Sequence, residues 1–504
     1  AQGTHVYEIS GRCGVFAKTD IQPLLIQGAA RADIALSTFH AVAKQTIGGL
    51  SQGLELTPPI IFEGGPLTFH PTLIRIFAER LNLKEEDIIR PEHPETIVAR
   101  GTALAIDQLF PGEERGTMTL AEAEERLRHA AASRDESAPG RKFFASAGDE
   151  AAFTARHRAE LMQPADGLSA PVLRAYIGID SGSTTTKFVV INEDEQVTDT
   201  YYDHNNGEPL RVARQGLTAL AEKYRAAGVR LEILGVGTTG YGEQMMARAV
   251  QADYHTVETV AHAEGCRKFV PDATFLLDIG GQDMKAIWLR DGVVTNIVLN
   301  EACSSGCGSF LENFAASLGI PVREIAAAAF RSRTPAVLGS RCTVFMNSTI
   351  INEQRNGKQA DDLMAGLCRS IIENVFTKVV RIANVSELGD RIVVQGGTFR
   401  NLAVLRALEE YLGREVTLSP YPGEMGALGA ALAAKRHIGQ YGYANGRCSS
   451  FIGFEAVERL TWTRESGVAC GLCANHCSRT ITRFSTGGSF VTGNRCDRGA
   501  IVAD

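Results

Sequence analysis

The sequence predicts an α/β protein that contains two related units, and three observations support this prediction. The composition, with 44% hydrophobic and 22% charged residues, is that of an ordinary globular protein. Short apolar runs that end in glycine turns alternate with segments of helical periodicity. Short motifs of the N-terminal part also recur, in the same order, in the second half of the chain.

The internal repeat rests on three pairs of matching motifs. They are residues 12–16 with 341–345, residues 60–65 with 392–397, and residues 99–105 with 427–433. Three matches in one order at a nearly constant offset indicate a duplicated unit. In the second copy, a long region precedes residue 341. The first copy has no counterpart of this region. We therefore expect repeat one to lack its N-terminal half, and the chain given to be a fragment.

Four segments follow from this repeat and from changes in composition along the chain. We expect residues 1–107 to form the C-terminal half of the first unit, with helices over 33–50, 73–81 and 95–106 and a strand over 60–62. Residues 108–170 are rich in charge and punctuated by Gly, Ser and Pro, which predicts a linker with surface helices. Residues 171–437 form the second, complete unit, and residues 445–504 begin a further cysteine-rich domain that is truncated.

The second unit opens with a strand and a small-residue turn. Residues 176–180 read as a strand that ends in Asp180, and residues 187–192 and 197–202 as a hairpin. Such a turn offers N–H and hydroxyl donors to phosphate oxygens, and its carboxylate is placed to hold a hydrated Mg²⁺. The spacing matches neither the dinucleotide-binding fingerprint nor the P-loop, and an ordinary hairpin turn is the alternative.

Two more glycine turns follow strand-like runs. Residues 275–277 lead into Asp278 and the sequence DIGGQD, and residues 392–394 lead into QGG at 395–397. Residues 284–289 and 293–299 alternate like paired strands around the turn Asp291-Gly292. Three such turns are what a cleft between two subdomains needs in order to surround a triphosphate.

These turns resemble the phosphate-1, phosphate-2 and adenosine motifs of the superfamily of acetate and sugar kinases, heat-shock chaperone ATPases and actin, which has a ribonuclease H-like fold. The resemblance implies that Asp180 holds Mg²⁺ through water, that Gln282 positions the attacking water, and that Asp278 is a further catalytic carboxylate. It also implies an ATP site formed by Gly182, Ser183, Thr184, Thr185, Lys187, Gly280, Gly281, Asp283, Gly396 and Gly397. Residues 238–242 either line the same cleft or form a simple turn.

The eleven cysteines occur partly in short-spaced groups, which favours metal ligation in a reducing compartment over disulfides. Cys266 and Cys368 lie in apolar helical contexts and are expected in the core. Cys303 precedes a helical pattern, so we expect it beside a helix N-terminus, where free N–H groups favour a thiolate or an anionic cluster.

The segments around Cys303 (NEACSSGCGSF, 300–310) and Cys342 (SRCTVF, 340–345) resemble the BadF/BadG/BcrA/BcrD-type activator ATPases of 2-hydroxyacyl-CoA dehydratases, a group that includes ATPase subunits of benzoyl-CoA reductases. In that family, two ATPase units each give two cysteines to one four-iron four-sulfur cluster. The resemblance therefore implies Cys303 and Cys342 as ligands. Cys307 stands where the small family members usually have threonine, and is either a nearby non-ligand or an auxiliary ligand.

The resemblance to the large, tandem form of the family implies where the other two ligands come from. Cys13 occupies in repeat one the place of Cys342, and would be the third ligand with an absent cysteine upstream of Ala1. The ATPase units would then form an intrachain pseudo-dimer, in contrast to the homodimer of the small activators.

A second cysteine group lies near the C-terminus. Its spacing fits a metal site better than core packing, and iron–sulfur and zinc both remain open. Its members are Cys470, Cys473, Cys477 and Cys496. His476 lies within the group and is expected at the surface.

The resemblance implies an ATP-driven electron donor that passes a low-potential electron, received from a ferredoxin or flavodoxin, to an acyl-CoA dehydratase or reductase-type acceptor. A small-metabolite kinase of the same superfamily and a non-catalytic ATP-binding scaffold are the alternatives. The net charge of −7 argues against a nucleic-acid partner, and the sequence has no apolar run of about 18 residues that would span a membrane. We expect a cytoplasmic protein.

Overall fold

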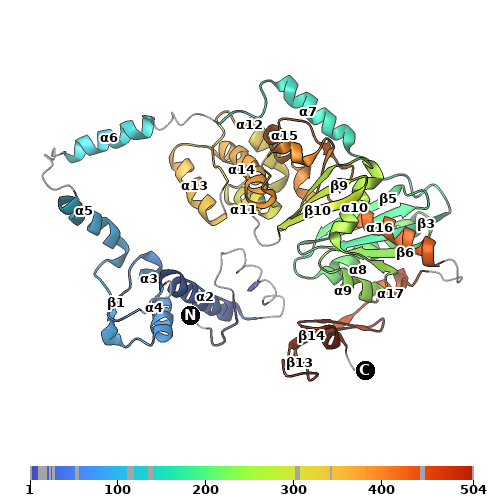
Figure 1. Cartoon of the computed structure of the whole chain (residues 1–504), viewed down its shortest axis with the longest axis horizontal. Helices are drawn as coiled ribbons and strands as arrows, with labels where there is room; N and C mark the ends of the chain where they lie inside the picture. Colours follow the sequence, from blue (N-terminus) through green and yellow to red (C-terminus); the bar gives the residue numbers. More distant parts are fainter. Residues whose placement is uncertain are drawn as a thin grey trace. The chain divides into compact units, whose positions relative to one another are not determined.

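The computed structural model describes most of the chain as two compact units, residues 1–137 and 138–504 (Figure 1). The structure describes residues 3–9, 17, 20, 21, 24, 29–51, 56–109, 118–133, 140–300, 307–340, 343–382, 384–442 and 449–501. Each unit is described by itself below. Both contain parallel strands with helices between them, and the predicted α/β class is confirmed.

The first lobe of the second unit is a five-stranded sheet in the order β5-β4-β3-β6-β7. Its first three strands form antiparallel pairs, which confirms the predicted strand and hairpin, and β6 and β7 continue in parallel. The strands are β3 (Val172–Ser181), β4 (Thr185–Asn192), β5 (Val197–His204), β6 (Arg230–Thr239) and β7 (Tyr254–His255). Helices α8 (Pro209–Ala226) and α9 (Glu243–Val250) cover one face, which presents Ile177 and Ile179 to them.

The second lobe has the sheet order β10-β9-β8-β11-β12. Strands β9 and β10 form the predicted hairpin around Asp291 and Gly292, both of which have positive φ. The strands are β8 (Phe275–Ile279), β9 (Met284–Arg290), β10 (Val293–Asn300), β11 (Ile392–Gln395) and β12 (Thr417–Leu418). The helices are α11 (Gly308–Ser317), α12 (Ile325–Arg331), α13 (Thr343–Arg355), α14 (Ala360–Asn374) with a π-helical extension, η6 (Val375–Val380), and α15 (Leu402–Leu412).

Two helices, α10 (Glu258–Phe269) and α16 (Met425–His437), cross where the lobes meet. The crossing is so close that a Cβ added at Gly429 would lie 1.7 Å from the carbonyl oxygen of Ala261. The other side of α16 lies on the first sheet, where a Cβ at Gly178 would lie 1.8 Å from the oxygen of Ala427. Glycines at these points are therefore required by backbone contact.

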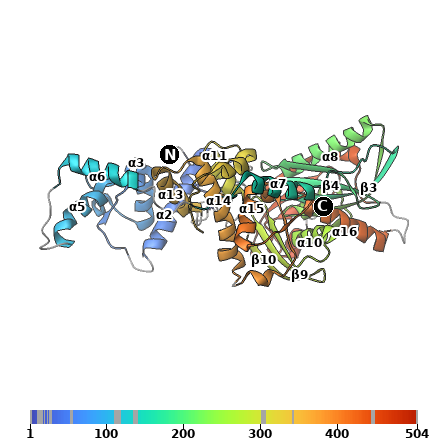
Figure 2. The same ribbon diagram turned by 90° about the horizontal axis from the view of Figure 1, so that it is seen from above.

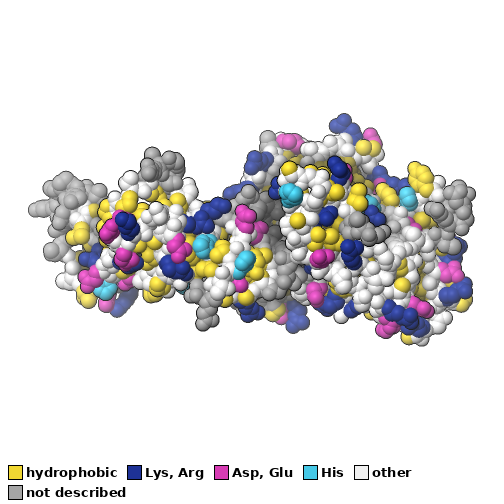
Figure 3. All heavy atoms as spheres, turned by 90° about the horizontal axis from the view of Figure 1, so that it is seen from below, with side chains coloured by type: hydrophobic (Ala, Val, Ile, Leu, Met, Phe, Trp, Pro, Cys, Tyr) yellow, Lys and Arg dark blue, Asp and Glu magenta, His cyan; other side chains and the backbone are white. Residues whose placement is uncertain are grey.

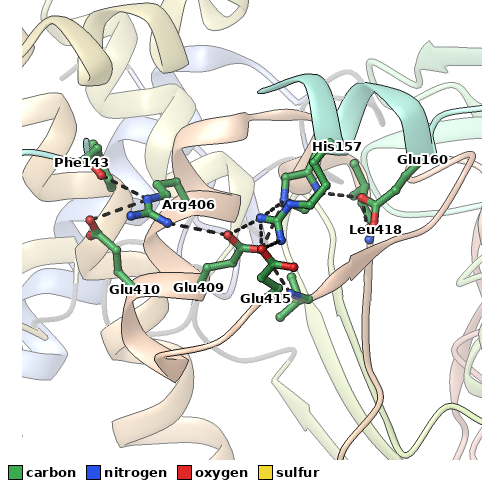
Figure 4. Close-up of polar contacts among 10 residues, drawn as sticks. Phe143, His157, Glu160, Arg406, Glu409, Glu410, Glu415 and Leu418 are labelled. Atoms are coloured by element: carbon green, nitrogen blue, oxygen red, sulfur yellow. Dashed lines mark hydrogen bonds and ion pairs between the residues drawn. The ribbon is translucent and has the colours of Figure 1, made fainter. Parts of the chain in front are cut away.

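Residues 140–171, which we call the strap, run across both lobes. Helix α7 (Ala147–Glu160) begins with a capping box at Ser146, and buries Phe153 and His157 against the second lobe (Figure 4). Beyond α7, Ala165 N–H donates to the oxygen of Val197 in the first lobe at 2.7 Å. We predicted a linker with surface helices here, and this stays a prediction. Most residues of α7 are exposed, while Phe153 and His157 pack against the second lobe.

A three-stranded antiparallel ribbon follows the helix α17 (Phe454–Glu458). It consists of β13 (Trp462–Ala469), β14 (Ser478–Phe484) and β15 (Ser489–Thr492). The ribbon is attached to the first lobe by a hydrogen bond of 3.1 Å from Gln251 to the carbonyl oxygen of Thr486.

The unit of residues 1–137 repeats the element order of the second half of the other unit. Its strands β1 (Ile60–Ile61) and β2 (Ile88–Ile89) pair in parallel, as β11 and β12 do. Gly64 after β1 has φ 93° and ψ 157°, and Gly396 after β11 has φ 96° and ψ 151°. The helices are α2 (Arg31–Ser51), α3 (Gly65–Phe69), α4 (Pro71–Leu81), α5 (Ile97–Leu109) and α6 (Leu120–Ser133).

Helices α4 and α15 both have 11 residues, and α5 and α16 both have 13. Matching lengths, strand pairing and glycine conformation support the repeat that was inferred from sequence. The predicted domain boundaries stay a prediction.

Charges of both signs are interspersed over the face drawn in Figure 3, in keeping with the modest net charge. Among the described residues, no helix is both long and apolar enough to cross a bilayer.

Candidate active site

The glycine turns of the two lobes face each other. The phosphate-1 turn, residues 181–185, follows β3 in the first lobe, and the phosphate-2 turn, residues 280–283, follows β8 in the second. A Cβ added at Gly281 would lie 3.0 Å from the hydroxyl oxygen of Thr184. The sequence thus identified two turns that meet across the cleft, although they lie about a hundred residues apart.

Two buried carboxylates stand at the ends of these strands. Asp180 is fully buried and Asp278 is 3% exposed. Lys187, opposite Asp180 in the β3–β4 pair, places its ammonium 2.9 Å from the Oδ2 atom of Asp180. Burial alone would lower the pKa of Lys187, but the charge of Asp180 outweighs it and the pKa is raised.

The second carboxylate oxygen of each aspartate fits a divalent cation. Neither Oδ1 of Asp180 nor Oδ1 of Asp278 accepts a hydrogen bond among the described residues, although Oδ1 of Asp278 lies 3.5 Å from Nδ1 of His262. A buried carboxylate oxygen without a partner is costly, and Mg²⁺ with its water shell is the ligand that such oxygens satisfy. The donor set therefore fits the Mg²⁺ that accompanies ATP.

The turn after β6 lines the same cleft. Gly240 has φ 88°, and a Cβ there would lie 2.6 Å from the Oδ1 atom of Asp180. Gly242 N–H donates to the carbonyl oxygen of Ser181 at 2.8 Å. Of the two readings of residues 238–242, the contacts favour a wall of the phosphate site.

The phosphate-2 turn is bonded directly to helix α11. Gly308 N–H donates to the oxygen of Gly280 at 2.9 Å, and Ser309 N–H donates to the oxygen of Gly281 at 2.7 Å. The Thr398 hydroxyl donates to the oxygen of Gly280 at 3.0 Å. We expected free N–H groups at the start of this helix, but two of them hold the phosphate-2 turn instead.

The third turn closes a cavity beside these two. Gly396 has a positive φ, and a Cβ there would lie 2.2 Å from the oxygen of Ile279, so this position requires glycine. Gly397 opens onto a cavity of about 270 Å³. The guanidinium of Arg400 lies 4.7 Å from the ring centroid of Tyr202 at its rim. Its polar and aromatic lining residues include Tyr202, His204, Glu312, Arg323, Thr398, Arg400 and Asn401.

Four polar residues of the site were not singled out from sequence as functional. Glu258 and His262 belong to the crossing helix α10, Lys285 to β9 and Gln395 to β11. Among the described residues, Asp180, Glu258 and His262 are the one set of three potential ligands whose atoms lie within 4.8 Å of one another. The turn motifs gave no signal for Glu258 and His262, because these two residues lie on the helix that precedes β8 and not in a glycine turn.

His262 contacts residues at the ends of both β11 and β8. Its Nδ1 atom lies 2.6 Å from the amide of Gln395 and 3.5 Å from Asp278, and its Nε2 atom lies 3.4 Å from Glu258. Burial alone would lower the pKa of His262, but the charge of Asp278 and the contact with Glu258 raise it.

The other residues that were predicted to contact phosphate lie in the two glycine turns, where the sequence placed them. Thr185 is buried, Gly182 accepts a hydrogen bond of 2.7 Å from Asn205, and Ser183 lies exposed between them. Gln282 is half-buried within the phosphate-2 turn. Burial raises the pKa of Asp283. The charge of the neighbouring Lys285 lowers this pKa by a smaller amount, so the net shift is upward. Their roles toward nucleotide remain predictions.

The cysteines proposed for the shared cluster, Cys303, Cys342 and Cys13, lie outside the described residues. Cys307 is buried and is the N-cap residue of α11. Cys266 and Cys368 are buried as predicted, and burial raises the pKa of both thiols to about 12.

The C-terminal cysteines occupy the ribbon. The loop between β13 and β14 is closed by a hydrogen bond of 2.8 Å from Cys470 N–H to the oxygen of Cys477. Cys470 is buried, Cys477 is partly exposed, and Cys473 and Cys496 are exposed. His476 is exposed, as predicted. A metal held by the four thiols stays a prediction.

Known proteins resemble the chain over this unit. A 2-hydroxyglutaryl-CoA dehydratase activating ATPase of Acidaminococcus fermentans is 32% identical over 263 residues, which are 51% of this chain and 96% of that protein. A benzoyl-CoA reductase subunit of Thauera aromatica is 28% identical over 275 residues, which are 52% of this chain and 93% of that protein.

A solved structure, the activator of 2-hydroxyisocaproyl-CoA dehydratase from Clostridium difficile with bound ADPNP, is 29% identical, with a TM-score of 0.46, and covers 53% of this chain and 96% of its own. Residues 177–434, about half of the chain, match the sequence pattern of the BadF/BadG/BcrA/BcrD ATPase family. The chain belongs to the BadF/BadG/BcrA/BcrD ATPase family.

Proposed function

We propose that the protein is an ATP-dependent iron–sulfur electron donor that serves an acyl-CoA dehydratase or a related acyl-CoA reductase. One observation carries the coupling part of this proposal. The phosphate-2 turn accepts two backbone hydrogen bonds from Gly308 and Ser309, at the start of the helix that follows Cys303. A movement of this turn on hydrolysis would therefore be passed to the cysteine segment.

ATP hydrolysis would use the residues of the two lobes in distinct roles. Asp180 and Asp278 would hold the hydrated Mg²⁺ through their free oxygens, and Lys187 would face the phosphates. When bound, Mg²⁺ neutralises charge on the phosphate oxygens. Gln282 would orient the attacking water from the phosphate-2 turn. The hydroxyls of Ser183, Thr184 and Thr185, and the N–H groups of the glycine turns, would donate to the phosphates.

The adenosine part of ATP would occupy the cavity of about 270 Å³ between α11 and Gly397. Its lining combines Tyr202 and Arg400, which can pack against flat or ribose surfaces, with charged Glu312 and Arg323. Because α11 forms one wall, nucleotide in this cavity would contact the same helix that the phosphate-2 turn holds.

The redox chemistry would come from thiolates in the segments next to this helix. Cys303 and Cys342 would be two ligands of a four-iron four-sulfur cluster, and another ATPase unit would supply two more, with Cys13 of repeat one as the candidate within this chain. Such a cluster supplies one-electron chemistry at low potential. The upstream reductant would be a ferredoxin or flavodoxin. The acceptor would be a dehydratase-type or reductase-type protein, as the relatives' names suggest.

Anaerobic purification of the full-length protein tests this proposal. We expect a brown protein with an iron–sulfur charge-transfer band, and loss of that band in Cys303→Ala and Cys342→Ala. Cys266→Ala is the matched control, because this thiol is buried in the core of the second unit. A colourless protein that hydrolyses ATP normally would reject electron donation, and stoichiometric phosphate transfer to a metabolite would favour the kinase alternative.

A further inference from the structure

Lys285 lies at the centre of the carboxylates around the cleft. Its side chain is only 4% exposed. The Nζ atom lies 2.7 Å from Asp283, 3.0 Å from Glu258 and 3.7 Å from Asp278. These three carboxylates come from three different elements: the β8–β9 turn, the first turn of α10 and the end of β8. One ammonium therefore ties three elements together.

The contact with Glu258 extends this tie to the other lobe. Glu258 lies on the helix that crosses between the lobes, and its carboxylate is within 4.8 Å of a ligand atom of Asp180. Lys285 thus holds a carboxylate, that of Glu258, beside Asp180. Lys187 forms the corresponding pair with Asp180 in the first lobe.

The charges around the cleft explain why a buried lysine is needed. Asp180, Glu258, Asp278 and Asp283 place four carboxylates at this site, two of them buried and two partly exposed, so like charges repel there more strongly than at an open surface. Burial alone would lower the pKa of Lys285, but the surrounding carboxylates outweigh it and raise the pKa, so the side chain is a permanent cation. The contact with this cation also helps to keep the pKa of Glu258 low, against the effect of burial.

We propose that Lys285 is a positioning residue that sets the divalent-cation dependence of ATP hydrolysis. It acts through Glu258 and Asp278, whose carboxylates it holds in place, and it reduces the negative charge that attracts Mg²⁺. This inference rests on the proposed ATPase function. Without the ammonium of Lys285, the carboxylates attract Mg²⁺ more strongly. The bound Mg²⁺ is then less well placed for ATP hydrolysis.

The test measures, for the full chain, ATP hydrolysis against free Mg²⁺ concentration and, without turnover, the affinity for Mn²⁺ in the presence of a non-hydrolysable ATP analogue. It compares the wild type, Lys285→Met and Lys285→Arg. In Lys285→Met, we expect kcat to fall about tenfold or more, and the half-saturating Mg²⁺ concentration to fall about threefold or more. Lys285→Arg keeps the charge and should restore the Mg²⁺ dependence to within about twofold. Lys223→Met, which removes an exposed lysine paired with Asp199, is the matched control.

The inference is overturned if the half-saturating Mg²⁺ concentration stays the same or rises in Lys285→Met. A fall in kcat alone does not support the inference, because a structural defect also lowers kcat or the amount of folded protein. If Lys285→Met does not fold, Lys285→Gln and Lys285→Arg give the same comparison. A wild type that does not hydrolyse ATP rejects the proposed function itself. An active wild type with an unshifted Lys285→Met rejects only the role of Lys285.

Discussion

The Nη2 atom of Arg156 in the strap lies 2.7 Å from both carboxylate oxygens of Glu409 in α15 (Figure 4). Glu409 is 4% exposed, and it also accepts from Val416 N–H and lies 3.3 Å from Nε2 of His157. Figure 2 shows α7 alongside α15 from a second direction. This buried carboxylate is therefore one of the points at which the strap is fixed to the second lobe, together with the bonds from Arg406 to Phe143 and from Leu418 to Glu160.

Glu409→Gln should destabilise the second unit by about 3 kcal/mol, because it leaves Arg156 and His157 without their shared buried counter-charge. Glu415→Gln is the matched control: Glu415 pairs with the same arginine at 2.6 Å but is 78% exposed, so its loss should cost less than about 1 kcal/mol. Urea unfolding measures both values, and limited proteolysis of the strap shows whether it detaches. Equal losses in the two variants would contradict this role of Glu409.

The strap should also make stability depend on pH through His157. Burial alone would lower the pKa of His157, but Glu160, whose Oε2 atom lies 2.6 Å from Nδ1, and Glu409 raise it. A raised pKa in the folded state means that the stabilisation is complete below the ordinary value of about 6.5, and is lost as the pH rises through the folded value. The Tm difference between wild type and His157→Gln should therefore shrink on going from pH 6 to pH 9. A difference that grows with pH would show that the imidazole is held neutral.

Gly429 should not tolerate alanine, because α10 and α16 cross there by backbone contact. Gly429→Ala forces a Cβ to within 1.7 Å of the Ala261 oxygen, so the crossing helices must separate, at a cost of about 3 kcal/mol and with loss of ATPase activity. Chemical unfolding and phosphate release measure both effects. A tolerated Gly429→Ala would contradict the close crossing of α10 and α16.

Gly308→Ala should uncouple the phosphate-2 turn from α11. A Cβ at this position would lie 2.6 Å from the hydroxyl oxygen of Thr398 and 3.3 Å from the oxygen of Gly280, so the helix must move away from the turn. We expect ATP hydrolysis to continue at a reduced rate, with a larger fall in electron transfer per ATP hydrolysed. Thr398→Val removes the hydroxyl bond to Gly280 without added bulk and should have the same effect in weaker form. A constant electron-to-ATP ratio in both variants would show that coupling does not pass through this contact.

The sequence predicted those parts of the site that are local in the chain. The turns after β3, β8 and β11 were recognised because glycines follow each strand end, with a nearby carboxylate in the first two, and the β9–β10 hairpin was recognised because Asp291 and Gly292 supply its turn. Burial of Cys266 and Cys368 followed from their apolar helical surroundings.

Contacts between distant segments could not be predicted in the same way. Glu258 enters the site only because α10 crosses α16 at Gly429, and no local pattern near Glu258 indicates that crossing. The strap reads as a charged linker because Arg156 and His157 are polar, and their shared partner Glu409 lies about 250 residues away, although His157 also contacts the nearby Glu160. The alternating pattern of residues 284–289 predicted the strand that contains Lys285. It did not indicate that three carboxylates from other segments would surround this lysine.

The central claim is that nucleotide chemistry in the cleft acts on a redox centre in the adjoining cysteine segments. The most direct measurement is the electron paramagnetic resonance spectrum of the anaerobically purified, reduced, full-length protein with and without Mg²⁺ and ATP, in the wild type and in Asp180→Asn. We predict an iron–sulfur signal in both proteins that changes on addition of ATP in the wild type and not in Asp180→Asn. A protein without iron–sulfur signal, or a wild-type signal that ATP does not alter while ATP is hydrolysed, would contradict the account.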